Sequence, residues 1–280
     1  MYEAHAPAIH HAPQMVTPDT YVIRQLFGEG TAPVGVYVNA MVIKAKEPVI
    51  VDTGTFSNRE AYLRDIFSLV DPKDVRWIFL SQDDHDHVGN AELLMQLCPN
   101  ATLVTTWFML ERLAGDYEFP LNRVRWMNDG DALHVGDRTL YAVRPPVYDT
   151  PTTRGLFDAK TGVYWASDAF GTPVLEATED VGDLDKAFWD EGFSGLQRII
   201  SPWFEIADAG KFNKTVDTVA NLQPKVIATG HGPLITGANV AESMKMMREI
   251  IGQPAAPLLG QADLEALIAA TMVAPAKKAA

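Results

Sequence analysis

Hydrophobic and polar positions alternate along the chain in short blocks, and each block predicts a strand or a helix. The nearly continuous apolar run at residues 75–81 indicates a strand that is buried on both faces. Apolar residues at helical spacing between Leu63 and Val70 predict an amphipathic helix over residues 58–70. Such segments follow one another to about residue 250, with no linker rich in Pro, Gly or Ser. Strands and helices mixed through one uninterrupted stretch predict an α/β layered fold.

Two segments at the ends lack this periodicity. The first 18 residues are rich in Ala, Pro and His, and we expect a flexible arm there. Loose metal binding by His5, His10 and His11 is an alternative that the composition favours less. The expected organisation is therefore an arm at 1–18, an ordered domain at 19–252, and a C-terminal helix and tail at 253–280.

Side chains that can bind metals stand where four of the predicted strands end. They are Asp52, the acidic and histidine cluster at residues 82–87, Asp168 and His231. Strand ends at one edge of a sheet are where α/β proteins gather their binding residues. We therefore expect these four segments to meet in space.

The cluster at residues 82–87 reads Gln-Asp-Asp-His-Asp-His. A metal ion needs carboxylate or imidazole donors held around one point, and this loop supplies both kinds. The alternative is a solvated acidic loop that caps the helix starting near Asn90, where negative charge is favourable. The additional donors at Asp168 and His231 favour the metal site.

Composition narrows the functional classes. The net charge of −13 and the pI near 4.9 argue against a nucleic-acid partner. The sequence has neither an apolar run long enough for a membrane span nor a secretory signal, so we expect no membrane association. The single cysteine, Cys98, excludes an intramolecular disulfide and fits a cytoplasmic location.

Three motifs in order resemble the metallo-β-lactamase superfamily: DHVGN at 86–90, SDAFG at 167–171 and ATGHGPL at 228–234. The longer stretches YWASDAFG and IISPWF…KVIATGHGP are similar to flavodiiron proteins and related oxygen-binding diiron proteins. The resemblance covers about residues 20–250. It implies a four-layered αββα metallo-β-lactamase sandwich for residues 19–252, with the metals at one rim of the two sheets.

The resemblance also implies one complete metal position. Its ligands would be two carboxylates and two imidazoles: Asp86, His87, Asp168 and His231. Asp168 matches the carboxylate that bridges two metals in the family. This donor set suits iron, and zinc or manganese are possible.

The second metal position departs from the family pattern His-x-Glu-x-Asp-His. Gln82 stands at the first histidine and Asp84 at the glutamate, while Pro146 stands where a further histidine is expected. Without a nitrogen donor, this position would prefer a hard, oxygen-binding cation. We therefore expect one firm metal and a second that is weak or absent.

Two other assignments of the loop residues remain open. An alternating trio of Asp83, His85 and His87 could bind the metal, but it would abandon the Asp-His-x-Gly match. Asp52 matches an early Asp-x-Gly turn of the family, which implies that it supports the loop through hydrogen bonds.

The flavodiiron resemblance implies a non-haem iron protein that reduces dioxygen or nitric oxide, or senses one of them. About 30 residues follow residue 250, too few for a flavin domain, so we expect no flavin and a separate electron-donor protein. The resemblance also implies a homodimer. One alternative is metal-dependent hydrolysis of an ester, thioester or phosphodiester, with Asp84 or Asp86 as general base. Another is a degenerate scaffold without catalytic activity.

Overall fold

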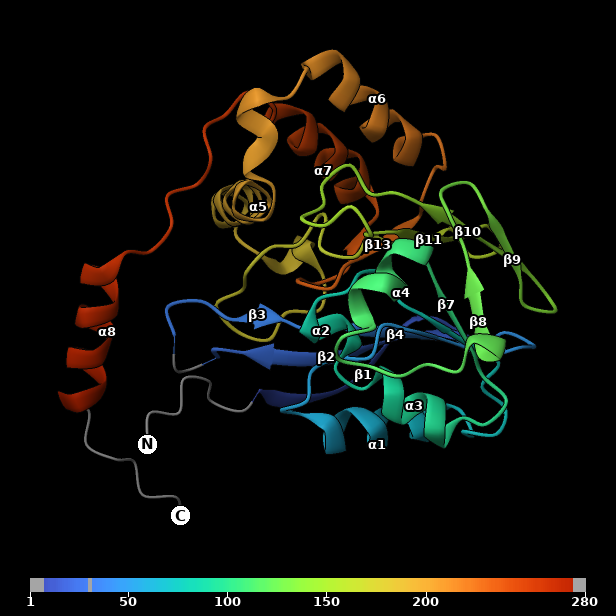
Figure 1. Ribbon diagram of the computed structural model, residues 1–280. Coiled ribbons are helices and arrows are strands. Elements are labelled where there is room, and N and C mark those ends of the chain that lie inside the picture. The colour runs from blue at the N-terminus through green and yellow to red at the C-terminus, as the bar shows by residue number, and fades with distance from the viewer. Residues whose placement is uncertain (1–7, 30–31, 274–280) are drawn as a thin grey trace.

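Two β-sheets pack face to face, and helices cover the outer face of each (Figure 1). The structure, a computed structural model, describes residues 8–29 and 32–273. This arrangement is the αββα sandwich that the sequence resemblance implies. Within the described residues, no helix has both the length and the apolar character that crossing a membrane requires.

The first sheet runs in the order β1-β2-β4-β5-β6-β7-β8, and β3 pairs with β2 beside this path. The pairs from β5 to β8 are parallel, while β1, β2, β4 and β5 pair antiparallel. The strands are β1 (Ile9–Thr17), β2 (Thr20–Phe27), β3 (Val36–Tyr37), β4 (Ala40–Ile43), β5 (Val49–Val51), β6 (Trp77–Phe79), β7 (Thr102–Thr105) and β8 (Val124–Trp126).

The second sheet runs in the order β14-β13-β12-β11-β10-β9. Its only parallel pair among the described strands is β12 with β13. The strands are β9 (Ala132–His134), β10 (Thr139–Val143), β11 (Gly155–Asp158), β12 (Val163–Trp165), β13 (Val226–Ala228) and β14 (Ile235–Thr236).

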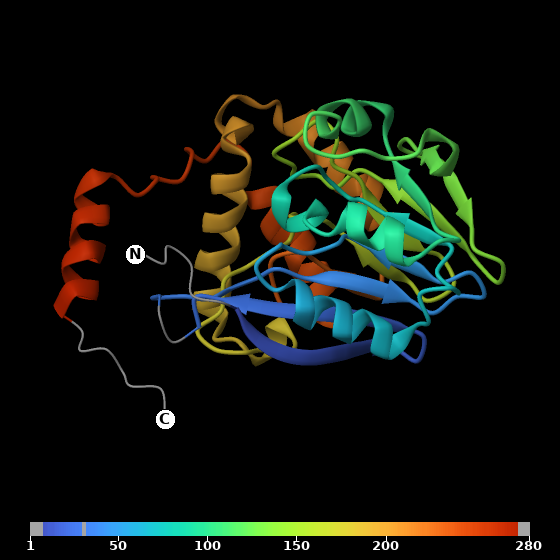
Figure 2. The same ribbon diagram turned by 60° about the horizontal axis from the view of Figure 1, so that its bottom comes forward.

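The helices divide between the two outer faces, as the two views show together (Figures 1 and 2). Helices α1 and α3 lie against the first sheet, whereas α5, α6 and α7 cover the second, and α8 stands apart from the sandwich. The helices are α1 (Arg59–Leu69), α2 (His85–Val88), α3 (Ala91–Leu97), α4 (Trp107–Leu113), α5 (Lys186–Ile200), α6 (Ala209–Ala220), α7 (Ala238–Glu249) and α8 (Gln261–Val273).

The hydrophobic core has three main parts, which correspond to the three interfaces between four layers. Residues of both sheets, such as Val51 and Phe79 of the first and Leu140 and Trp165 of the second, form the central part. A second part joins the first sheet to α1 and α3, and a third joins the second sheet to α5, α6 and α7. Removal of apolar surface from water at these interfaces is the main force that holds the layers together.

The N-terminal segment corrects one expectation. Residues 9–17 form the edge strand β1, hydrogen-bonded to β2, rather than a flexible arm. Polar and small residues on an exposed edge hide the alternation that marks a strand, and Pro13 falls where the register shifts. His10 contacts Asp65 and His11 contacts Glu29, so these histidines attach the strand to the domain. His5 lies outside the described residues.

Candidate metal centre

The four chain segments predicted to meet do converge at one edge of the sandwich. Asp52 follows β5, and the loop that begins at Ser81 follows β6, its parallel neighbour in the first sheet. Asp168 follows β12, and His231 follows β13, its parallel neighbour in the second sheet. Parallel strands end at the same edge, so each sheet delivers two of the segments.

The one-turn helix α2 requires the glycine that follows it. A Cβ atom on Gly89 would lie 2.6 Å from the carbonyl oxygen of Gly54 and 2.8 Å from that of His85. Asn90 then donates from its side-chain amide to the carbonyl oxygens of Thr53 and Thr55, at 2.7 and 2.9 Å. These contacts attach α2 to the loop after β5. They explain why Gly89 and Asn90 follow the Asp-His pair in the DHVGN motif.

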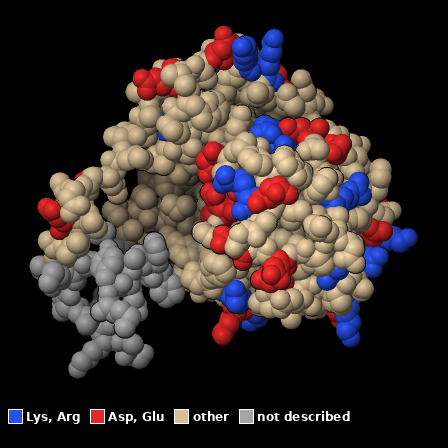
Figure 3. Space-filling model, viewed as in Figure 1, with Lys and Arg blue, Asp and Glu red and all other residues tan. Residues whose placement is uncertain are grey.

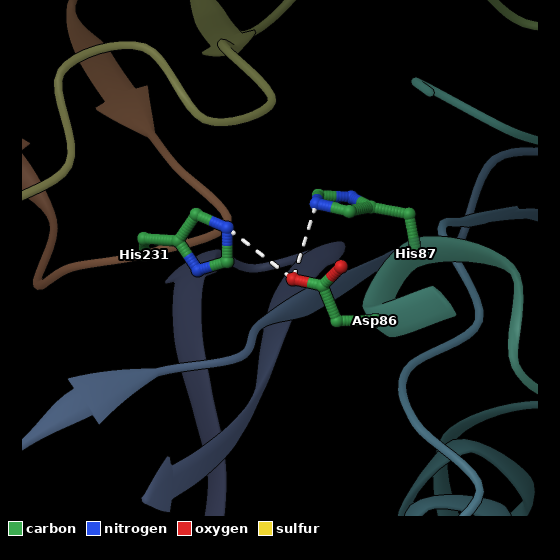
Figure 4. A group of neighbouring side chains, drawn as sticks. All are labelled: Asp86, His87 and His231. Atoms are coloured by element: carbon green, nitrogen blue, oxygen red, sulfur yellow. Dashed lines mark ion pairs between the residues drawn. The ribbon is translucent and has the colours of Figure 1, made fainter. Parts of the chain in front are cut away.

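Asp86 and His87 of α2 and His231 of the loop after β13 point toward one another (Figure 4). One ligand atom from each of them lies within 4.8 Å of the others. The Asp86 Oδ2 atom is 3.6 Å from His87 Nε2 and 3.4 Å from His231 Nε2. Three donors from two sheets around one point are the arrangement that a metal ion needs.

Asp168 completes this group from the interior. Its Oδ1 atom lies 3.0 Å from His87 Nε2 and 3.1 Å from His231 Nε2. Within the described part of the chain, Asp168 Oδ1 and His87 Nε2 are nevertheless buried polar atoms without a well-aligned hydrogen bond. Such atoms are costly unless something satisfies them. A cation coordinated by both would do so, and the residues therefore fit a metal ion.

The Nδ1 atom of each imidazole already has a hydrogen-bond partner, which leaves Nε2 available to bind a metal. His87 Nδ1 lies 2.9 Å from Asp52 Oδ2, and His231 Nδ1 lies 2.8 Å from the carbonyl oxygen of Tyr37. A carbonyl oxygen and a carboxylate both accept, so each Nδ1 carries the proton. This pattern is usual for histidines that bind metals, and it confirms that Asp52 supports the loop.

Negative charge dominates the centre. Burial alone would lower the pKa of His87, but the carboxylates of Asp86, Asp52 and Asp168 raise it well above its ordinary value. Burial likewise opposes protonation of His231, but Asp168 and Asp86 raise its pKa to about 9. Burial would raise the pKa of Asp168, yet the two imidazoles hold it well below its usual range. The carboxylates therefore favour positive charge at this centre, and a bound cation would replace the protons on the two imidazoles.

Gln82 contacts the other carboxylate oxygen of Asp168, and Asp84 lies near Asp149. Gln82 Nε2 donates to Asp168 Oδ2 at 2.8 Å, and Gln82 Oε1 accepts from Thr153 Oγ1 at 3.4 Å. The side chain of Asp84 shares a hydrogen bond with that of Asp149. Burial raises the pKa of Asp84, as does the nearby Asp86 carboxylate, although the bond to Asp149 opposes the rise.

Asp149 is a residue of the site that the sequence did not reveal. The loop after β10 brings Asp149, rather than Pro146, next to Asp84. Partial burial of the carboxyl group, followed by the charges of Asp168 and Asp84, raises the pKa of Asp149 to about 7. Pro146 is buried three residues earlier. The only signal in the sequence was one acidic residue between Tyr148 and Thr150.

Asp83 and His85 do not join the metal ligands, so the alternating trio is not supported. Asp83 accepts hydrogen bonds from Thr150 and Thr152 and pairs with Arg112 of α4. His85 is exposed, and its ring centre lies 6.2 Å from that of Phe56. Asp83 thus fastens the loop that carries Asp149 to the metal-binding loop.

An αββα sandwich with carboxylate and histidine ligands at one rim defines the metallo-β-lactamase fold class. Residues 36–232 match the family model described as "ODP family beta lactamase". The chain belongs to this family.

Curated relatives and solved structures point the same way. The chain is 29% identical over 209 residues to the "Putative diflavin flavoprotein A 2" of Nostoc sp., covering 72% of this chain and 34% of the relative. It is 23% identical over 199 residues to the "Anaerobic nitric oxide reductase flavorubredoxin" of Pectobacterium atrosepticum, covering 69% and 38%. The chain thus spans about a third of the length of such relatives.

Among solved structures, the rubredoxin oxygen:oxidoreductase of Desulfovibrio gigas superposes with a TM-score of 0.74 at 17% identity, covering 85% of this chain and 61% of that one. The flavodiiron protein of Giardia intestinalis gives a TM-score of 0.74 at 17% identity, covering 86% and 60%. These likenesses establish the fold.

Proposed function

We propose that the chain is the metal-bearing domain of a non-haem iron protein that handles dioxygen or nitric oxide. The observation that carries this proposal is the convergence of Asp86, His87, Asp168 and His231, with two buried ligand atoms left unsatisfied. The names of the relatives, a nitric oxide reductase and an oxygen oxidoreductase, support the choice of substrate class.

Iron bound by these ligands would supply binding of a diatomic gas and one-electron chemistry. The four ligand residues differ in how far they are exposed to solvent around the ion. His87 and Asp168 are buried and fix the ion from within, while Asp86 and His231 keep 29% and 15% of their side-chain surface exposed. We propose that a small gaseous ligand reaches the centre on this exposed side.

We propose that the second metal position is weak and prefers a hard cation. Its candidate donors are all oxygens: Asp84, Asp149, the Oδ2 atom of Asp168 and the amide oxygen of Gln82. Gln82 already donates to Asp168 Oδ2, and Asp84 already shares a hydrogen bond with Asp149. A second ion would compete with both contacts, whereas an ion at the first position would replace only protons on the two imidazoles.

Electron supply and assembly are part of the proposal. We propose that a separate electron-donor protein reduces the iron and that the protein forms a homodimer. If the centre binds gas without turnover, the same arrangement serves as a sensor.

Anaerobic purification followed by metal analysis and absorption spectroscopy tests the proposal. We expect about one firmly bound iron per chain and a spectral change when dioxygen or nitric oxide is added. A colourless zinc protein that cleaves esters, thioesters or phosphodiesters would establish the hydrolase instead. A chain without metal would establish the scaffold.

A further inference from the structure

The carboxylate that supports His87 is unusually well supplied with hydrogen-bond donors. Asp52 is fully buried, and its Oδ1 atom accepts from the backbone nitrogen of Ser81 at 2.6 Å. Its Oδ2 atom lies within bonding distance of three donors: Ser81 Oγ at 2.6 Å, His87 Nδ1 at 2.9 Å and Trp165 Nε1 at 3.0 Å. The bond to the metal ligand therefore competes with two others for one oxygen atom.

Trp165 supplies one of these three donors from the second sheet. It ends strand β12, is fully buried between the sheets, and belongs to the central core. An indole nitrogen can only donate, so the direction of its bond to Asp52 is fixed. The tryptophan thus joins the interior of the second sheet to a carboxylate of the first, directly behind His87.

We propose that Trp165 is a positioning residue that sets how strongly His87 binds the metal. A donor to Asp52 Oδ2 takes up part of the negative charge that would otherwise draw the proton on His87 Nδ1. A carboxylate that attracts this proton more strongly makes the imidazole a more basic metal ligand. The indole of Trp165 therefore makes His87 a weaker metal ligand than it would be if Asp52 Oδ2 bonded to it without this competing donor. This inference rests on the proposed metal position at His87.

The inference predicts effects of opposite sign at two residues of the same network. Trp165→Phe removes one donor from Asp52 Oδ2 while Ser81 still holds the carboxylate, so His87 should bind Fe²⁺ more tightly, by about threefold or more. Asp52→Asn removes the charge and should weaken Fe²⁺ binding by about 10- to 100-fold. If Trp165 only filled space, its loss would loosen the site and both variants would bind Fe²⁺ more weakly.

Two further variants test whether the change in Fe²⁺ binding comes from the lost hydrogen bond to Asp52 and not from the loss of an indole ring. Ser81→Ala removes the hydroxyl donor to the same oxygen with little loss of volume, and it should also tighten binding. Trp189→Phe makes the same change of side chain in the outer core, where, among the described residues, the indole nitrogen has no hydrogen-bond partner. It should leave Fe²⁺ binding at the wild-type level.

The measurement is the dissociation constant for Fe²⁺ alone, obtained anaerobically by competition with a coloured chelator, with circular dichroism as the check of folding. Tighter binding in Trp165→Phe and Ser81→Ala, weaker binding in Asp52→Asn and no change in Trp189→Phe would support the inference. Equal or weaker binding in whichever of Trp165→Phe and Ser81→Ala folds would overturn it. Failure of the wild-type chain to bind Fe²⁺ would overturn the proposed function as well, so the two failures are distinguishable.

Discussion

At the scale of single residues, the centre is defined by an excess of carboxylate over positive charge. Asp52, Asp86 and Asp168 surround His87, and two of these carboxylates also face His231. Buried carboxylates persist only when they are paired or bind a metal. These carboxylates raise the pKa of both imidazoles, so the protonated imidazoles are favoured when no metal is bound.

This charge balance predicts how the stability of the metal-free protein depends on pH. The pKa of His231 is raised to about 9 in the folded protein, against about 6.5 for an unperturbed histidine. The folded state therefore binds the proton more tightly, and the resulting stabilisation is complete below about pH 6.5 and is lost as the pH rises to about 9. Thermal unfolding of the metal-free chain should show a falling midpoint temperature over this range. A midpoint that rises over the same range would contradict the assignment.

The role of Asp168 gives a second prediction at this scale. Asp168→Ala removes the carboxylate shared by both imidazoles, so the purified variant should lose most of its bound metal. Asp149→Ala is the matched control because Asp149 contacts Asp84, on the weak side of the centre. Metal analysis should find the firmly bound ion in the control. Wild-type metal content in Asp168→Ala would remove Asp168 from the ligand set.

At the scale of elements, the position of the proposed ligands Asp86 and His87 depends on how closely α2 approaches the loop after β5. Gly89→Ala would place a Cβ atom against the backbone oxygens of Gly54 and His85, which cannot move aside cheaply. We expect this variant to lower the free energy of unfolding by about 1–3 kcal/mol and to lose metal affinity.

Gly195→Ala is the control for this change. Gly195 lies inside α5, and a Cβ atom there meets nothing within 4 Å. Because alanine favours a helix over glycine, this variant should gain about 0.5–1 kcal/mol. Chemical denaturation measures both variants. Equal effects at the two positions would show that the close approach at Gly89 has no special importance.

Most of the elements could be predicted from the sequence because their pattern is strong. The apolar run at 75–81 contains β6, and the helical spacing between Leu63 and Val70 marks α1. Strand β1 could not be predicted, since an edge strand needs little apolar surface and gains its order from pairing with β2. Asp149 was missed because its place depends on the path of an irregular loop, which no periodicity records.

At the scale of the whole molecule, the proposed metal ligands come from both halves of the sandwich. Asp86 and His87 belong to a loop of the first sheet, while Asp168 and His231 follow strands of the second. The rim is seen from one side in the space-filling view, where acidic residues gather along the right-hand edge of the large hollow (Figure 3). An ion bound by these residues would resist separation of the two sheets.

Metal should therefore stabilise the entire domain. An ion that binds only the folded state raises the free energy of unfolding, by about 2.7 kcal/mol at 100 times its dissociation constant. Adding Fe²⁺ anaerobically to the metal-free chain should raise the midpoint temperature of a single unfolding transition. An unchanged midpoint at saturating Fe²⁺ would show that the ion does not bind the folded chain in preference to the unfolded one.

We propose one firm iron position at Asp86, His87, Asp168 and His231. The most direct test is metal analysis of anaerobically purified protein, together with its absorption spectrum before and after exposure to dioxygen or nitric oxide. We expect about one iron per chain and a spectral change on exposure, both lost in His231→Ala. Protein that carries almost no iron, or iron that is retained in full by His231→Ala, would contradict it.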